Sequence, residues 1–195
     1  MKYNYKYYDQ ISKSYNFTRK FFLFGYKSLL RYIINQKNIT SILDLASGTG
    51  KFLADLHKVK PNLKLSGVDL SSNMLQIAKK NYPDIKFINE DVFELTHIDD
   101  DLIILNYFLT LFDDPELLLS HLNKIISKKS RIIILDFYSF DNPIYAYFMK
   151  YQGAKCTLDI INIIEKYFEI EIIKTKKSPY LLWKYGILSL KKINI

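Results

Sequence analysis

The sequence predicts an α/β protein with a doubly wound sheet of seven strands, mostly parallel, that ends in an antiparallel hairpin. Two observations lead to this fold class. Short apolar runs alternate with segments of helical periodicity through the middle of the chain. Near the carboxyl end, two apolar runs are separated by a turn containing Ser178-Pro179, which is too short for a crossover helix. These two runs should therefore pair antiparallel.

Length and composition set the broad class. A chain of 195 residues, 49% hydrophobic and 25% charged, suits one globular domain with a full core. The net charge of +8 favours an anionic partner, such as nucleic acid, an acidic lipid surface or an acidic small molecule, without choosing among them. Cys156 is the only cysteine, so no disulfide can form within the chain. No apolar signal core opens the chain, and no apolar run reaches the roughly 18 residues of a spanning helix. We expect a cytoplasmic protein that could touch the inner face of a membrane.

Residues 1–37 carry apolar side chains near helical spacing, interleaved with arginine and lysine. This pattern predicts one or two helices, broken near Gly25. One interpretation is a helix packed on the sheet. The other is a helical lid over the ligand that also meets a hydrophobic substrate or lipid surface. The two can coexist.

The β–α units follow in order. Strands are expected at 41–45, 64–68, 85–88, 102–106 and 131–136, with helices at 50–60, 71–81 and 115–127. The helix at 115–127 has the clearest start, because Asp114 can cap it and Pro115 fits its first position. After a helical stretch near 143–166, the apolar runs 168–174 and 181–190 form the terminal hairpin. No repeat or linker divides the chain.

The stretch from Ile42 to Phe52 reads as an apolar strand that runs into a glycine turn and opens a helix. Gly48 and Gly50 permit backbone angles and a close ligand approach that a Cβ would hinder. The free N–H groups of the following helix point at the turn. Asp44 lies inside the strand, and a buried carboxylate there needs donors or a cation nearby. The N–H groups of the turn and a ligand ammonium would supply both.

Two more acids end the next strands. Asp69 follows the second strand, 19 residues past Gly50, where it can accept both ribose hydroxyls of an adenosine-containing ligand. Asp91 follows the third strand and can accept from an adenine amine. A dinucleotide is disfavoured, because its fingerprint needs a third glycine where this chain has Leu53.

These residues resemble the class I S-adenosylmethionine-dependent methyltransferases, which have a Rossmann-like fold. Asp44-x-Ala46-x-Gly48-x-Gly50 is similar to the first motif of that family, Gly67-Val68-Asp69-Leu70-Ser71-x-x-Met74-Leu75 to the second, and Glu90-Asp91 to the third. The resemblance implies S-adenosylmethionine as cofactor and no metal. It places Gly48 and Gly50 at the methionine part, Asp69 at the ribose, Leu70 and Met74 at the adenine faces, and Asp91 at the adenine amine. The full implied cofactor set is Asp44, Ala46, Ser47, Gly48, Gly50, Asp69, Leu70, Met74, Asp91, Val92 and Asn106.

Outer stretches bear on the methyl acceptor. Tyr107–Asp114, the early Tyr8-Asp9-x-x-Ser12-x-x-Tyr15, Leu135-Asp136-Phe137 and Leu182-Trp183-Lys184-Tyr185 resemble bacterial phospholipid N-methyltransferases. This resemblance implies transfer to an amine of a small or lipid-headgroup acceptor similar to phosphatidylethanolamine. The candidate site tyrosines are Tyr8, Tyr15 and Tyr107, whose rings could hold a methylated ammonium. The alternative is a quinone-ring C-methyltransferase, which shares the core motifs and the Phe24-Gly25 pair, or another small-molecule methyltransferase.

Other hypotheses stay in competition. A non-catalytic nucleotide-binding module, an NAD-dependent oxidoreductase and a nucleic-acid methyltransferase are each disfavoured by the motifs, and the last also lacks prolines after Asn106. No general base stands out, because His57, His97 and His121 fit structural or solvated positions. We expect a single domain, 1–195, with a helical lid at 1–37, a cofactor-binding core at 38–136, and a substrate-side helix and terminal hairpin at 137–195.

Overall fold

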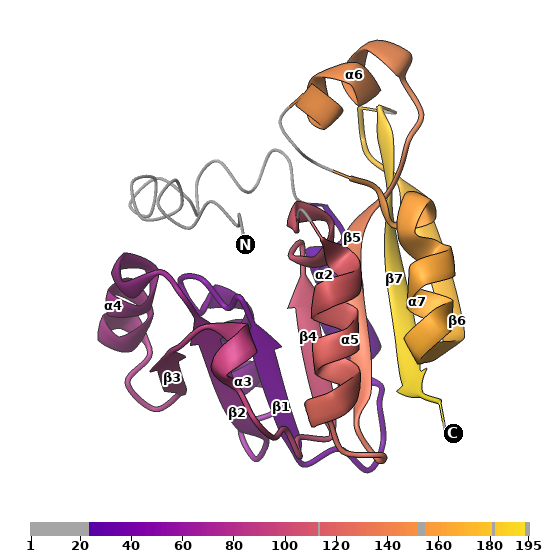
Figure 1. The fold of residues 1–195 in the computed structure, drawn as a ribbon. Coiled ribbons are helices and arrows are strands. Elements are labelled where there is room, and N and C mark those ends of the chain that lie inside the picture. Colours follow the sequence, from indigo (N-terminus) through magenta and orange to yellow (C-terminus); the bar gives the residue numbers. More distant parts are fainter. Residues whose placement is uncertain (1–23, 113, 152–154, 181, 194–195) are drawn as a thin grey trace.

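The computed structural model describes residues 24–112, 114–151, 155–180 and 182–193. Seven strands form one sheet in the order β3-β2-β1-β4-β5-β7-β6 (Figure 1). The first five pair in parallel, and β7 runs antiparallel to both of its neighbours. Their bounds are β1 Ser41–Leu45, β2 Lys64–Asp69, β3 Lys86–Asn89, β4 Leu102–Asn106, β5 Arg131–Phe140, β6 Phe168–Lys177 and β7 Trp183–Lys192. The predicted sheet and its terminal hairpin are confirmed.

Helices cover both faces of the sheet (Figure 1). They are α2 Tyr26–Ile34, α3 Lys51–Val59, α4 Ser72–Asn81, α5 Pro115–Ile125, α6 Pro143–Tyr151 and α7 Ile161–Tyr167. Three 3₁₀ turns lie between them, η1 Val92–Glu94, η2 Leu109–Leu111 and η3 Thr157–Ile160. The helical stretch expected near 143–166 is therefore not one helix. It divides into α6, η3 and α7, and only α7 packs against β6 as a layer of the fold.

Alternation along the strands builds two cores. In β4, Ile103 and Leu105 pack with α5 and α7, whereas Leu102 and Ile104 pack with α2 and α3 on the opposite face. Successive side chains of a strand point to opposite faces, so a strand covered on both sides is apolar throughout. This explains why the central strands read as continuous apolar runs in the sequence.

The described part of the predicted lid is α2, and it packs as a layer helix. It begins after Gly25, whose φ of 92° puts the backbone in the left-handed region. Leu29 and Ile33 are buried against the sheet, and the Tyr26 hydroxyl donates to Asp55 Oδ2 on α3 at 2.6 Å. This is the arrangement expected of a helix packed on the sheet. Residues 1–23, including Tyr8 and Tyr15, lie outside the described residues.

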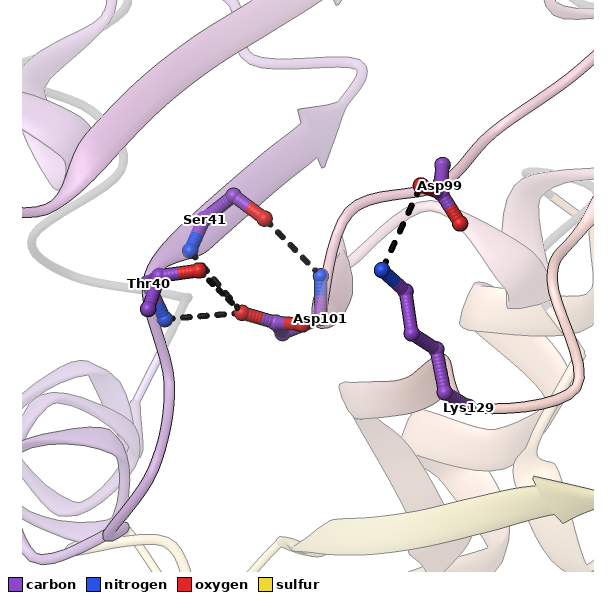
Figure 2. Close-up of polar contacts among 5 residues, drawn as sticks. All are labelled: Thr40, Ser41, Asp99, Asp101 and Lys129. Carbon is purple, nitrogen blue, oxygen red and sulfur yellow. Dashed lines mark hydrogen bonds and ion pairs between the residues drawn. The ribbon is translucent and has the colours of Figure 1, made fainter.

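The amino edge of the sheet is fastened by side chains (Figure 2). One oxygen of Asp101 accepts from the Thr40 amide and hydroxyl, each at 2.7 Å, and from the Ser41 amide at 3.2 Å. The Ser41 hydroxyl in turn accepts from the Asp101 amide. These bonds join the start of β1 to the start of β4, and the hydrogen bond from the Thr40 hydroxyl holds the pKa of Asp101 below its usual range. Nearby, Lys129 pairs with Asp99 at 3.3 Å.

In the described part of the chain, no helix has the length and apolar character needed to cross a membrane.

Candidate functional site

The glycine turn leaves the carboxyl end of β1 and leads into α3. Ala46, Gly48 and Gly50 all have positive φ, at 60°, 56° and 72°. The Gly50 amide donates to the Ser47 carbonyl, and the Ser47 amide donates to the carbonyl of Val68 on β2. The turn is thus tied to the neighbouring strand. Its conformation explains the glycines, since left-handed backbone is costly for residues with a Cβ.

Asp69 ends β2 and joins the turn to the next helix. Its buried carboxylate accepts from the Gly48 amide at 2.7 Å and from the Ser71 amide at 2.8 Å. Ser71 in turn caps α4, where its hydroxyl accepts from the Met74 amide. The acid predicted to meet a ribose therefore also holds together the loops that follow β1 and β2.

Gly50 has a packing role besides its conformation. A Cβ built on it would stand 2.5 Å from Cζ of Phe87 on β3 and 3.1 Å from Cβ of Ala78 on α4. The amino end of α3 therefore approaches β3 more closely than any larger residue would permit. The sequence indicates close ligand approach at this glycine, and the structure adds a close contact within the protein.

A pocket opens at the carboxyl ends of β1 and β2, with about 400 Å³ of empty space, open solvent included. Its lining residues are Leu45, Ala46, Val68, Asp69, Leu70, Glu90, Asp91, Val92, Phe108 and Phe112. Five of the predicted cofactor residues are among them, namely Ala46, Asp69, Leu70, Asp91 and Val92. In an open α/β sheet, this edge is where ligands bind.

The charges of this lining are all negative. Asp69, Glu90 and Asp91 contribute carboxylates, and the lining given above holds no lysine, arginine or histidine, although the whole chain carries +8. Such a pocket repels the phosphates of a dinucleotide or nucleic acid and attracts a cation. S-adenosylmethionine carries a cationic sulfonium and an ammonium, with an adenosine whose hydroxyls and amine can donate to carboxylates. The residues present therefore fit this cofactor.

The other predicted cofactor residues support the pocket from outside its lining, in the described structure. Asp44 and Met74 are buried under the turn and in α4, and Gly48 and Gly50 shape the turn itself. The Ser47 hydroxyl lies against Gly67, 2.6 Å from where a Cβ would be, so it faces β2. Asn106 ends β4, and its buried Oδ1 has no hydrogen-bond partner among the described residues. A bound ligand could supply that partner.

Asp91 also has a local role. Its Oδ1 accepts from the Phe93 amide at 3.1 Å and caps η1. Behind the same turn, Nε2 of His121 on α5 lies 3.0 Å from the Val92 carbonyl. Because a carbonyl only accepts, this nitrogen donates, and His121 holds the pocket wall from behind. This agrees with the structural position expected for His121.

Sequence reasoning missed the aromatic wall. Phe108 and Phe112 line the pocket and meet edge to face with ring centroids 4.9 Å apart, and Phe93 packs on Phe112 at 6.0 Å. The signal was present in the apolar stretch after β4. It could not be assigned to the pocket because nothing in the periodicity shows that Phe108 and Phe112 come to line the same pocket as Leu45 and Ala46.

A second missed residue is Asp136, which is fully buried in β5 beside η2. Its carboxylate accepts from the hydroxyl and the amide of Thr110 and from the Phe137 amide. Burial raises the pKa of Asp136 to about 6 despite these donors. The bonds to Thr110 fix η2, the turn between the two pocket-lining phenylalanines.

Tyr107, the one candidate tyrosine that the structure describes, is buried. Its hydroxyl donates to the Phe24 carbonyl at 2.6 Å, and its ring meets Phe137 edge to face at 5.0 Å. Its φ of 53° places a bulky residue in the left-handed region directly after β4. Such strain is typical of functional sites. Here it directs the ring into the core and joins Phe24 to the site.

Comparisons with known proteins agree with this geometry. A family model described as a methyltransferase domain matches residues 36–178. A demethylmenaquinone methyltransferase of Thermotoga maritima is 30% identical over 154 residues, which are 73% of this chain and 67% of that protein. A carboxy-S-adenosyl-L-methionine synthase of Campylobacter hominis is 36% identical over 105 residues, 52% of this chain and 44% of that protein. The chain thus spans about two thirds of the first relative and less than half of the second.

A solved structure shares the fold. The N-methyltransferase NodS from Bradyrhizobium japonicum WM9, in complex with S-adenosyl-l-homocysteine, superposes with a TM-score of 0.68 at 13% identity, over 87% of this chain and 86% of that one. At this identity the likeness speaks for the fold alone. The family model, in contrast, covers most of the sequence, including every strand of the parallel half of the sheet. Because the family model matches most of the chain and the first relative is 30% identical over 73% of it, this chain belongs to the class I S-adenosylmethionine-dependent methyltransferases.

Proposed function

We propose that this chain transfers a methyl group from S-adenosylmethionine to a ring carbon of a quinone-class acceptor. The observation that carries the proposal is the 30% identity to the demethylmenaquinone methyltransferase of Thermotoga maritima over 73% of this chain. The sequence motifs alone favour an amine of a lipid headgroup first and a quinone ring second. The relatives favour the second.

The cofactor supplies an electrophilic methyl group on a sulfonium. We assign its adenosine to the acid-lined pocket, where Asp69 and Asp91 meet the ribose and the adenine amine and Leu70 packs on the base. We assign its methionine part to the turn at Gly48 and Gly50. Holding the donor and acceptor aligned is worth up to roughly 7–11 kcal/mol in such a displacement. These residues contribute by position and charge.

Two aromatic features bear on the ligands. Phe108 and Phe112 belong to the lining of the pocket that we assign to adenosine, so their rings can pack against the adenine. The ring of Tyr107 is buried and its hydroxyl is engaged by Phe24, so it does not offer a face to a methylated ammonium. With cofactor and acceptor bound, the new bond would join the methyl group to a carbon of the reduced ring as the S–CH₃ bond breaks. The thioether S-adenosylhomocysteine would leave, and the proton of that ring carbon would pass to water.

The proposal extends to the organisation of the chain. Residues 38–136 hold the cofactor, and residues 137–195 contribute to the acceptor side. Quinone-class acceptors with apolar tails reside in membranes, so we also propose peripheral contact with an anionic bilayer. The net charge of +8 supports that contact.

A direct assay tests the acceptor. The purified protein is incubated with methyl-labelled S-adenosylmethionine and either a reduced, short-tailed demethylated naphthoquinone or vesicles containing phosphatidylethanolamine. We expect label in the quinone fraction and none in the phospholipid. Label in phospholipid alone would overturn the proposal and restore the amine interpretation.

The variant Asp69→Asn tests the assignment of the cofactor site. Removing the charge from the adenosine pocket should weaken S-adenosylhomocysteine binding by about 10- to 100-fold, measured by calorimetry, since hydrogen bonds to charged groups contribute about 1.5–3 kcal/mol. If the wild-type protein bound S-adenosylhomocysteine but methylated none of the acceptors, the result would instead support the non-catalytic module.

A further inference from the structure

Helix α6 exposes an apolar stripe that the fold does not use. Ile144, Tyr147, Phe148 and Tyr151 are 82%, 76%, 54% and 80% exposed. Their spacing of three, four and seven residues places them on one side of the helix. Scattered apolar side chains on a surface are ordinary, but a contiguous aromatic face on one helix marks an interaction site.

The stripe is held rigidly against the body of the protein. On another side of α6, the ring of Tyr145 stacks on Trp183 with centroids 4.9 Å apart. The side chain of Asn142 accepts from the Tyr145 amide at the start of the helix, and the amides of Asp141 and Asn142 donate to the Leu182 carbonyl. These contacts fix α6 to the turn between β6 and β7, so its outer face does not result from a loosely attached helix.

The position of α6 relates it to the pocket. The helix follows β5, and it lies beyond the carboxyl edge of the sheet together with the β6–β7 turn (Figure 1). The cofactor pocket opens at the same edge, after β1 and β2. An object that touches the stripe therefore faces the edge of the molecule at which the acceptor must enter.

The charge around the stripe identifies the partner. Lys150 on α6 and Lys177 at the end of β6 are exposed, and Tyr180 in the adjoining turn is 54% exposed. Asp141 at this end pairs with Lys184 at 3.6 Å, which offsets its charge. An apolar aromatic face bordered by lysines matches the interface of an anionic bilayer, where aromatic side chains lie at headgroup level and lysines meet phosphates.

We propose that α6 is the membrane-docking element of this protein and that the stripe Ile144, Tyr147, Phe148 and Tyr151 inserts into the surface of an anionic lipid bilayer. The docked orientation turns the carboxyl edge of the sheet toward the membrane and admits a lipid-soluble acceptor. The inference rests on the proposed function for its purpose, but lipid binding itself requires neither cofactor nor acceptor.

Vesicle sedimentation of the full chain tests the docking. We expect binding to phosphatidylcholine vesicles that contain phosphatidylglycerol, weaker binding without it, and a decrease with added salt. Ile144→Ser combined with Phe148→Ser should lower the partition coefficient by about tenfold or more. Both side chains are exposed, so thermal unfolding should be unchanged. Val59→Ser combined with Leu117→Ser, which removes two side chains of about 50% exposure elsewhere, should leave partition unchanged.

Two outcomes would overturn the proposal. Equal partition of the α6 variant and the wild type would remove the stripe from lipid binding. A wild-type dimer that the α6 variant converts to a monomer, with vesicle binding retained, would assign the stripe to a second copy of the chain. Methylation assays distinguish a failure of the docking proposal from a failure of the proposed function. The α6 variant should retain turnover on a water-soluble acceptor and lose it on the same ring embedded in vesicles, whereas vesicle binding without any quinone turnover would contradict the function alone.

Discussion

Ala46 occupies the first backbone position after β1 with a φ of 60°, a conformation that favours glycine. An alanine with left-handed backbone costs roughly 1–2 kcal/mol in the folded state. Glycine removes this strain, but it also makes the unfolded chain more flexible, which cancels part of the gain in stability. We therefore expect Ala46→Gly to raise the free energy of unfolding by about 0.5–1 kcal/mol, measured by urea denaturation.

Ala54 provides the opposite control, because it lies inside α3 with helical backbone. Ala54→Gly should lower the free energy of unfolding by about 1 kcal/mol. A loss of stability in both variants would mean that the conformation at Ala46 does not carry the cost assigned to it.

Asp136 makes stability depend on pH. Its carboxyl has a pKa of about 6 in the folded protein, against 3.8 ordinarily, because burial disfavours the charged form. Between these values the folded state binds the proton more tightly than the unfolded state, so its contribution to stability falls as pH rises from about 4 to about 6. The difference corresponds to about 3 kcal/mol. Urea unfolding of wild type and Asp136→Asn across this range should show a gap that closes or reverses as pH rises.

Other carboxyls titrate in both proteins, so the difference between them isolates Asp136. A gap that stays constant from pH 4 to pH 7 would contradict the raised pKa. The side-chain Oδ1 of asparagine can still accept from one of the amides of Thr110 and Phe137, which keeps the variant measurable.

At the level of single residues, the sequence predicted the positions of side chains that directly follow a clearly periodic strand. Asp69 and Asp91 follow strands whose periodicity is clear, so their meeting at one edge of the sheet follows from parallel topology. Asp136 lies within such a strand, but its partner Thr110 lies in a short 3₁₀ turn that has no periodicity. Asp136 could therefore be located on β5 but not assigned to the loop that it holds.

Helices and strands were predicted correctly where a strand is buried on both faces or where a helix has a clear N-cap. Helix α5 begins at Pro115 with the Asp114 side chain accepting from the Leu117 amide, as the sequence indicates. The stretch 143–166 failed as one helix for the opposite reason. Its apolar residues face the body at Tyr145 and the exterior at Ile144 and Tyr147, and a pattern of apolar residues alone does not show which face is covered.

At the scale of secondary-structure elements, the close packing of α3 on β3 can be tested by substitution. Gly50→Ala adds a Cβ 2.5 Å from the Phe87 ring at a backbone φ of 72°. Overpacking and left-handed strain together should cost about 3 kcal/mol of unfolding free energy and weaken S-adenosylhomocysteine binding. Denaturation and calorimetry measure the two effects.

Phe87→Leu in the Gly50→Ala background separates the causes. Shortening the ring removes the overlap but leaves the strained backbone, so the double variant should recover part of the lost stability relative to the sum of the single variants. Strictly additive losses would show that Phe87 does not oppose the new methyl group.

Across the whole molecule, charge and chemistry are distributed unevenly. The chain carries +8, yet the pocket at the carboxyl edge of β1 and β2 is lined by three carboxylates. The overall charge therefore says little about the ligand in the pocket and more about the outer surface, where Lys150 on α6 and Lys177 at the end of β6 are exposed. Composition alone pointed to anionic partners, and only the folded arrangement separates a cationic ligand from an anionic surface.

The two edges of the sheet should respond differently to ligand. S-adenosylhomocysteine at about 100 times its dissociation constant adds about 2.7 kcal/mol of stability, which raises the melting temperature by roughly 5–10 °C for a domain of this size. Asp101→Ala removes three hydrogen bonds at the amino edge and should lower the melting temperature by a few degrees while leaving the ligand-induced rise intact. Asp69→Asn at the carboxyl edge should lose about half of that rise or more at the same ligand concentration. Thermal scans with and without ligand compare the three proteins. If Asp101→Ala also lost the ligand-induced rise in melting temperature, that rise would depend on the stability of the whole sheet. The separation between a structural edge and a binding edge would then be wrong.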